Sequence, residues 1–113
     1  MTWSLMIHGG AGGMTHDNLP AAQDAGARAG LSRALDAGAG VLAVGGSAVD
    51  AVEAAVKVLE DDPHFNAGRG AAFTDAGENE LDAAIMDGRT RAAGAVAGAT
   101  TVRNPVLDRK SVV

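Results

Sequence analysis

The chain has 113 residues, enough for one domain, and its composition excludes several classes of protein. Hydrophobic residues make up 47% of it, which argues against wholesale disorder. The net charge of −5 disfavours nucleic acid as a partner, because an acidic surface repels phosphate. Cysteine is absent, which excludes disulfides and thiolate metal sites. We find no apolar stretch of membrane-spanning length and no signal peptide, so we expect a cytoplasmic protein.

The N-terminal half of the chain predicts one strand followed by two helices. The apolar run 3–7 leads into a glycine-rich turn at 8–13, which is typical of a strand that ends in a tight turn. Residues 21–43 predict a helix, and Ser47 predicts the N-cap of a second helix that ends near Glu60. The first helix has apolar-face residues at helical spacing: Leu31, Leu35, Gly38 and Leu42. The stripe expected on the second consists of Val49, Val52, Val56 and Leu59.

The C-terminal half predicts strands joined by tight turns. Strand candidates lie at 71–73, 81–86 and 92–97, and Asp87-Gly88 is a hairpin signal between the last two. Asn104-Pro105 predicts the start of a further helix, with proline at its first position. Helices followed by sequential strands indicate an α+β fold, in which the helices lie against a mainly antiparallel sheet.

Several familiar site motifs are incomplete in this sequence. Gly10-Ala11-Gly12 matches only half of a dinucleotide-binding fingerprint, and the expected helix begins too late for it. The three histidines lack zinc-type spacing, and we expect His8 to satisfy hydrogen bonds beside the glycine turn. Ser47 lacks the glycine that a nucleophile elbow needs two residues later. If Met1 were removed, Thr2 would carry a free amine and become a conceivable nucleophile, which leaves that alternative open.

The segment 59–70 is a helix stop followed by glycines. Carbonyl groups of such a loop can turn inward together, and a ring of main-chain carbonyls suits a hard cation. An ordinary connector remains the alternative on composition alone.

Blocks of sequence distributed along the chain resemble the plant-type asparaginase/isoaspartyl peptidase family in order and spacing. They cover the chain to about Leu107 and comprise Ile7–Gly12, Leu59–Gly70, Glu80–Gly88, Ala93–Gly98 and Val102–Val106. The resemblance implies an N-terminal-nucleophile hydrolase fold, a four-layer αββα sandwich that is incomplete in this chain. It also implies a precursor that cleaves itself before a threonine, which then serves as both nucleophile and base.

The same resemblance implies activity and partners. Family members hydrolyse L-asparagine to aspartate and ammonia, and also hydrolyse isoaspartyl (β-aspartyl) dipeptides. Their α and β subunits stay together, usually as a dimer of αβ units. The alternatives are a non-catalytic scaffold module or a truncated product without activity and, within the wider superfamily, a glycosylasparaginase. No organic cofactor is expected.

Individual residues carry over from the family's motifs. His8, Gly9 and Gly10 resemble its glycine turn beside the active site, and Asn66 resembles an asparagine next to the nucleophile. The family's sodium-binding loop corresponds to six main-chain carbonyls, those of Leu59, Glu60, Asp62, Phe65, Ala67 and Arg69. The ion would stiffen the loop without taking part in bond cleavage.

The family's nucleophile motif, of the Gly-Thr-Val-Gly type, is absent from the 113 residues. Ala97-Gly98-Ala99-Thr100 is only superficially similar, because it precedes Arg103-Asn104-Pro105. We therefore expect residues 1–113 to be an α-subunit portion, inactive alone and without a catalytic residue of its own.

Overall fold

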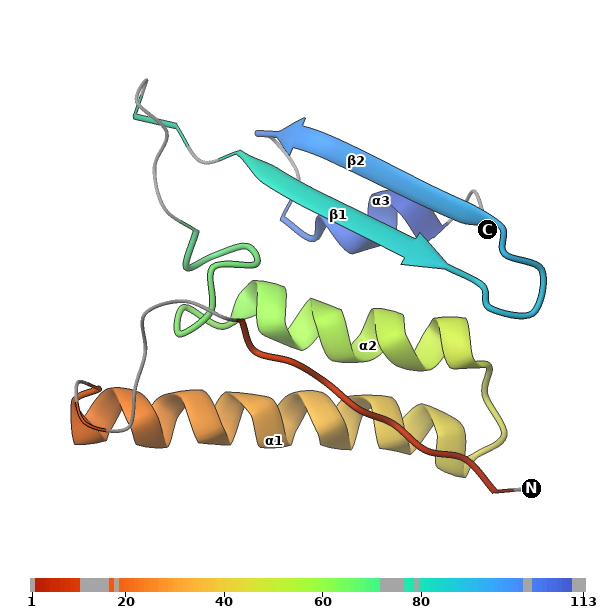
Figure 1. Ribbon diagram of the computed structural model, residues 1–113, viewed down its shortest axis with the longest axis horizontal. Coiled ribbons are helices and arrows are strands. Elements are labelled where there is room, and N and C mark those ends of the chain that lie inside the picture. Colours follow the sequence, from red (N-terminus) through yellow and green to blue (C-terminus); the bar gives the residue numbers. More distant parts are fainter. Residues whose placement is uncertain are drawn as a thin grey trace.

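The computed structural model describes residues 2–10, 17, 19–71, 77–78, 80–100 and 103–110. These residues form three helices and two strands (Figure 1), namely α1 (Ala21–Ala43), α2 (Ala48–Asp61), β1 (Leu81–Met86), β2 (Ala93–Ala99) and α3 (Pro105–Lys110). Helices α1 and α2 run in opposite directions side by side, and α3 packs between α2 and the β1–β2 hairpin. The predicted mixture of helices and an antiparallel sheet is confirmed at this level.

Small residues make the contact between α1 and α2. The buried positions of α1 are Gly30, Ala34 and Gly38, at four-residue spacing, and those of α2 include Ala51 and Ala55. Side chains this short let the two helices approach closely. The predicted leucine and valine stripes are therefore partly wrong, because Leu35 is 38% exposed and Val52 is 37% exposed.

The predicted boundaries of both long helices are confirmed, within one residue at the end of α2. The side chain of Ser47 accepts a hydrogen bond from the main-chain N–H of Asp50, which is the expected N-cap. Helix α2 ends at Asp61, directly before Asp62-Pro63, because proline disfavours helical geometry in the residue that precedes it.

The apolar run 3–7 was expected to form a strand, and the structure differs. Residues 2–10 have no strand pairing with any described residue, and the segment crosses the two long helices (Figure 1). Leu5 packs against α1 at Gly38, which has no side chain. A Cβ at that position would lie 2.7 Å from Leu5 Cδ2. An extended segment becomes a strand only when a neighbour supplies hydrogen bonds.

The β1–β2 hairpin is antiparallel, with Ala84 paired to Ala95 and Met86 to Ala93. The strand predicted at 81–86 is confirmed, whereas the one predicted at 92–97 runs from Ala93 to Ala99. A bulge shifts the register, and Gly98 adopts a φ of 64°, which glycine tolerates best. Asp82 Oδ1 accepts the Gly98 N–H at 2.9 Å. Of the strand predicted at 71–73, Ala71 is not in a strand and the rest lies outside the described residues.

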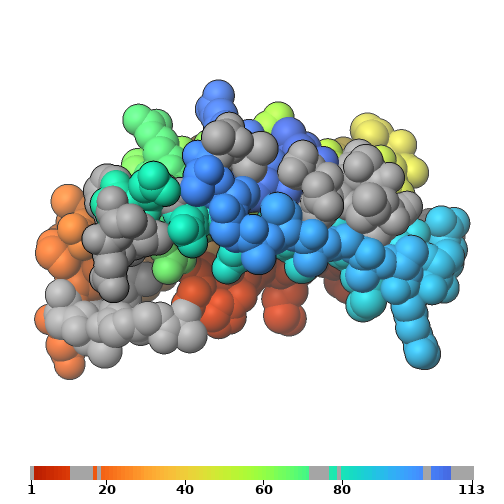
Figure 2. Space-filling model, turned by 90° about the horizontal axis from the view of Figure 1, so that it is seen from above, coloured from red at the N-terminus to blue at the C-terminus, as the bar shows by residue number. Residues whose placement is uncertain are grey.

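One face of the hairpin is turned away from the helices (Figure 1), and in Figure 2 the cyan and blue hairpin lies across the middle and right of the view. Side chains alternate along both strands, and the exposed ones are Asp82, Ala84, Met86, Ala93, Ala95 and Ala97. Ile85, on the opposite face, is buried. No helix in the described part of the chain is long and apolar enough to cross a membrane.

Candidate functional site

The glycine turn at residues 8–10 lies against the loop that follows α2. A Cβ on Gly9 would stand 3.0 Å from Phe65 Cε1 and 3.2 Å from Leu31 Cδ2, so the absence of a side chain is what permits the contact. The main-chain N–H of Gly10 donates to His8 Nδ1 at 3.0 Å, as predicted for His8. The structure therefore brings together two blocks more than fifty residues apart in sequence.

Phe65 anchors this loop from the inside. Its ring is only 6% exposed and belongs to a core cluster with Ala34, Ala55 and Leu59. Asn66, the next residue, is exposed at the surface, and it directly follows the buried Phe65 in the chain. The Phe65 N–H donates to the Asp62 carbonyl at 3.2 Å, which shapes the turn that leads to Asn66.

Asp62 holds the same loop to α1. Its buried carboxylate accepts hydrogen bonds from Arg33 Nη2 at 2.8 Å and from the His64 N–H at 2.9 Å, and lies 2.7 Å from His64 Nδ1. Burial alone would raise the pKa of Asp62. The hydrogen bonds from His64 and the charges of His64 and Arg33 outweigh burial and hold that pKa below its usual value.

Sequence reasoning did not predict this role for the side chain of Asp62. His64 is exposed, yet its ring is tied to Asp62 and packs on the bare backbone of Gly26. A local signal existed, because Asp commonly bonds the main chain two residues ahead. The contact with Arg33 spans 29 residues and had no such signal.

Glu60 is the second carboxylate that sequence reasoning missed. Its side chain accepts hydrogen bonds from the Val106 N–H at 3.1 Å and from Asn104 Nδ2 at 3.2 Å, and the residue is only 2% exposed. Burial raises the pKa of Glu60, and the negative charge of Asp61 raises it further, while the bonds from Val106 and Asn104 oppose both.

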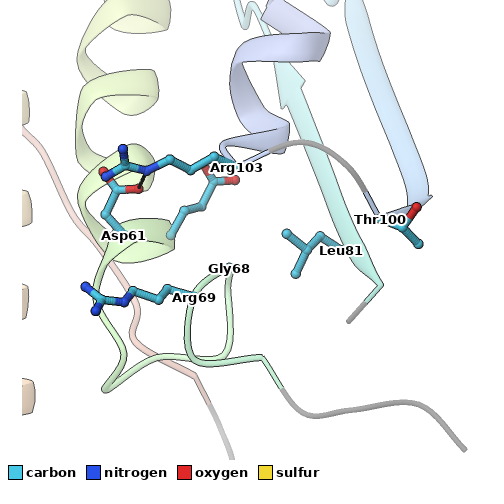
Figure 3. Close-up of a pocket in the computed structure, with 7 residues that line it drawn as sticks. Asp61, Gly68, Arg69, Leu81, Thr100 and Arg103 are labelled. Atoms are coloured by element: carbon cyan, nitrogen blue, oxygen red, sulfur yellow. Dashed lines mark hydrogen bonds and ion pairs between the residues drawn. The ribbon is translucent and has the colours of Figure 1, made fainter. Parts of the chain in front are cut away.

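A cavity of about 260 Å³ opens beside this carboxylate, where α2, the loop and the hairpin meet (Figure 3). In Figure 3, Arg103 reaches Asp61, with Nε 3.1 Å from Oδ1, and Leu81 and Thr100 enter from the hairpin side. The cavity is lined by Glu60, Asp61, Gly68, Arg69, Leu81, Thr100 and Arg103.

Carbonyl oxygens lie directly against two glycines of the loop. Glycine is required at both, because a Cβ on Gly68 would meet the Glu60 carbonyl and one on Gly70 would meet those of Pro63 and Phe65. Three of the six carbonyls predicted to bind sodium each accept a main-chain hydrogen bond, namely those of Leu59, Glu60 and Asp62. A carbonyl has a second lone pair, so these contacts leave acceptor capacity for a cation.

Side chains in the described residues do not make a metal site. No group of three or more His, Asp or Glu side chains there is arranged to hold an ion. Any cation on this loop would therefore depend on neutral main-chain oxygens, a donor type that suits hard cations.

The described site can position groups more readily than it can break bonds. Its fixed elements are a glycine turn, an anchored ring, an exposed amide and two buried carboxylates. His64 is engaged with Asp62, and Ser47 serves as a helix cap. No described serine, threonine or lysine takes part in a hydrogen bond with a histidine that would activate it.

Comparison with known proteins shows which sequences the chain is similar to. The sequence model of a family described as asparaginase matches residues 1–113. The chain is 47% identical to the isoaspartyl peptidase/L-asparaginase of Homo sapiens over 104 residues, which is 90% of this chain and 32% of the human protein. It is 45% identical to the isoaspartyl peptidase of Escherichia coli K12 over 109 residues, covering 96% of this chain and 34% of the relative.

A third relative, the isoaspartyl peptidase/L-asparaginase of Mus musculus, is 46% identical over 102 residues, with 90% of this chain and 30% of the mouse protein covered. The chain belongs to the asparaginase family. It spans about a third of the length of the curated relatives it matches.

Proposed function

We propose that this chain is the α-subunit portion of a hydrolase that acts on L-asparagine and isoaspartyl dipeptides. In this proposal, a β portion supplies an N-terminal threonine as nucleophile, after a precursor has cleaved itself, and the two portions complete a four-layer αββα sandwich. The observation that carries the proposal is the packing of Gly9 on Phe65, which places the glycine turn beside the loop that presents Asn66. Dimers of αβ units would be the assembled form.

The chain's own contribution would be to position the reacting groups. The amide of Asn66 has both a donor and an acceptor, so it can hydrogen-bond groups around a neighbouring threonine. Its main chain follows directly on the buried Phe65, whose N–H is bonded to the Asp62 carbonyl in the preceding turn. A fixed amide costs little ordering entropy when a reacting group docks against it.

A sodium ion on the loop belongs to the same proposal. The carbonyls of Leu59, Glu60, Asp62, Phe65, Ala67 and Arg69 would hold it, and its chemistry would be structural. The proposal is supported by the neutral main-chain oxygens of the loop, a donor type that suits hard cations.

The test is hydrolysis by the complete protein that carries this sequence. We expect ammonia release from L-asparagine and cleavage of a β-aspartyl dipeptide. Asn66→Ala should lower kcat by roughly 10- to 100-fold, because misplacement of groups around a nucleophile is costly. Gln23→Ala, an exposed change on α1, should leave kcat unchanged. Absence of both activities from the wild-type protein would contradict the proposal.

A further inference from the structure

The side chain of Glu60, in the last turn of α2, is hydrogen-bonded to the start of α3. Its carboxylate accepts hydrogen bonds from the Val106 N–H and from Asn104 Nδ2. Those donors begin α3, which packs against both strands of the hairpin. The end of α2 is thereby fastened to α3 through a buried carboxylate, and at the surface Asp61 Oδ1 also accepts hydrogen bonds from Asn104 Nδ2 at 3.0 Å and from Arg103 Nε at 3.1 Å.

The main chain of the same residue holds the loop. The Arg69 N–H donates to the Glu60 carbonyl at 2.7 Å, the shortest main-chain bond described in this loop. Gly68 lies flat against that carbonyl, since a Cβ there would stand 2.5 Å from the oxygen. In Figure 3 the loop at Gly68 and Arg69 passes below Asp61 and Arg103.

We propose that Glu60 is a positioning residue, which couples the loop that carries Asn66 to α3 and the hairpin. Its side chain and its carbonyl belong to one residue of α2, so the placement of α3 fixes the last turn of α2 and, through it, the loop. Release of the carboxylate frees that turn and loosens the Arg69 contact. The consequence of this coupling for catalysis rests on the proposed function.

Glutamate suits this role because both of its oxygens accept hydrogen bonds and both are used. Glu60→Gln retains the shape but turns one acceptor into an NH₂ group, which then faces either the Val106 N–H or the Asn104 amide. A buried donor left facing a donor is destabilising locally. Asn104→Ala is milder at Glu60, because it removes the Asn104 bonds to Glu60 and to Asp61 and leaves the Val106 bond in place.

Site-resolved amide hydrogen exchange of the complete protein tests the coupling. In Glu60→Gln we expect exchange at the Val106 and Arg69 amides to rise together, each by roughly tenfold, while amides in the middle of α1 keep their protection. The matched control is Glu80→Gln, the same change at an exposed position before β1, and it should behave as wild type. Asn104→Ala should raise Arg69 exchange by a smaller factor.

Two results would overturn the inference. Faster exchange at Val106 without any change at Arg69, in either variant, would mean that Glu60 only caps α3. An equal rise across α1, loop and hairpin would mean a general loss of stability. If Glu60→Gln does not fold, Asn104→Ala tests the coupling, and Arg69 exchange equal to that of wild type in this variant would overturn it. Hydrogen exchange is measured without substrate, so it does not depend on activity. Failure of the protein to hydrolyse asparagine would therefore contradict the proposed function but not the coupling through Glu60.

Discussion

Asp62 combines deep burial with three hydrogen-bonding contacts, and it ties the loop that follows α2 to the first helix. Its carboxylate meets Arg33 from α1 and two atoms of His64. A buried carboxylate is tolerated only when its lone pairs are used in this way. The shape of the loop next to Asn66 therefore depends on a side chain that touches neither Asn66 nor the glycine turn in any described hydrogen bond.

Asp62→Ala should lower the free energy of unfolding by about 1.5–3 kcal/mol, the range for hydrogen bonds to charged groups. Arg33 and the His64 N–H would lose their acceptor. Urea unfolding measures the change. Asp24→Ala is the matched control, because Asp24 pairs with Arg28 on the solvent side of α1 and such pairs contribute less than about 1 kcal/mol. Equal losses from the two variants would refute the role given to Asp62.

The pKa of Asp62 also predicts a pH dependence. Because the pKa is lower in the folded protein than in the unfolded chain, the folded state binds the proton less well. The carboxylate therefore contributes stability that is complete above the unfolded value of 3.8 and is lost as the pH falls through the lower folded value. Unfolding curves between pH 5 and 2 should show a smaller acid-induced loss in Asp62→Asn than in wild type. Identical pH slopes would contradict this.

Sequence reasoning succeeded at single residues where the physics is local. The Ser47 cap and the His8 contact with its own turn join atoms two or three residues apart, so the pattern contains both partners. The side-chain roles of Asp62 and Glu60 were missed, because their partners lie 29 and 46 residues away. Contacts at that range require the folded chain.

The buried face of helix α1 consists of small residues, Gly30, Ala34 and Gly38. Gly30 receives the Asp62 carboxylate and the Phe65 ring, and a Cβ there would overlap both. Its length and boundaries were predictable from propensity and spacing. The face it buries was not, because hydrophobicity patterns favour leucines over glycines as core residues, while close helix packing favours the glycines.

Gly30→Ala should destabilise the protein by about 1–3 kcal/mol, as overpacking of a filled site does. Gly40→Ala, on the same helix, is the ideal comparison, since no atom lies within 4 Å of its Cβ position. That change should instead stabilise by about 0.5–1 kcal/mol through helix propensity. Thermal unfolding followed by circular dichroism measures both. A stabilising Gly30→Ala would contradict the packing described here.

At the scale of the whole molecule, the outer face of the hairpin and the outward side of the segment 2–10 are left exposed in the described fold. The hairpin has only two strands, and its outer face presents Met86 at 57% exposure among several alanines. The segment 2–10 is extended without strand partners among the described residues. Two-stranded sheets are marginal by themselves, which agrees with a chain that spans a third of its relatives' length. The prediction of a strand at 3–7 was wrong for this reason, since strand pairing depends on neighbours.

A sodium effect on the complete protein belongs to this scale as well. If the loop carbonyls hold the ion in the folded state only, added NaCl should stabilise the folded protein by mass action and raise its melting temperature. The free energy of unfolding should increase by about 2.7 kcal/mol when the sodium concentration is 100 times the dissociation constant. Choline chloride at the same ionic strength is the control for general salt effects. Equal rises in the two salts would argue against a sodium site.

The most direct measurement is denaturing intact-mass analysis of the complete protein, purified under mild conditions from its native source. The account predicts two polypeptides in equal amounts, one containing this sequence and a second that begins with threonine. Blocking of that threonine's amine should abolish ammonia release from L-asparagine. A single uncleaved polypeptide that lacks a downstream threonine nucleophile would contradict the account.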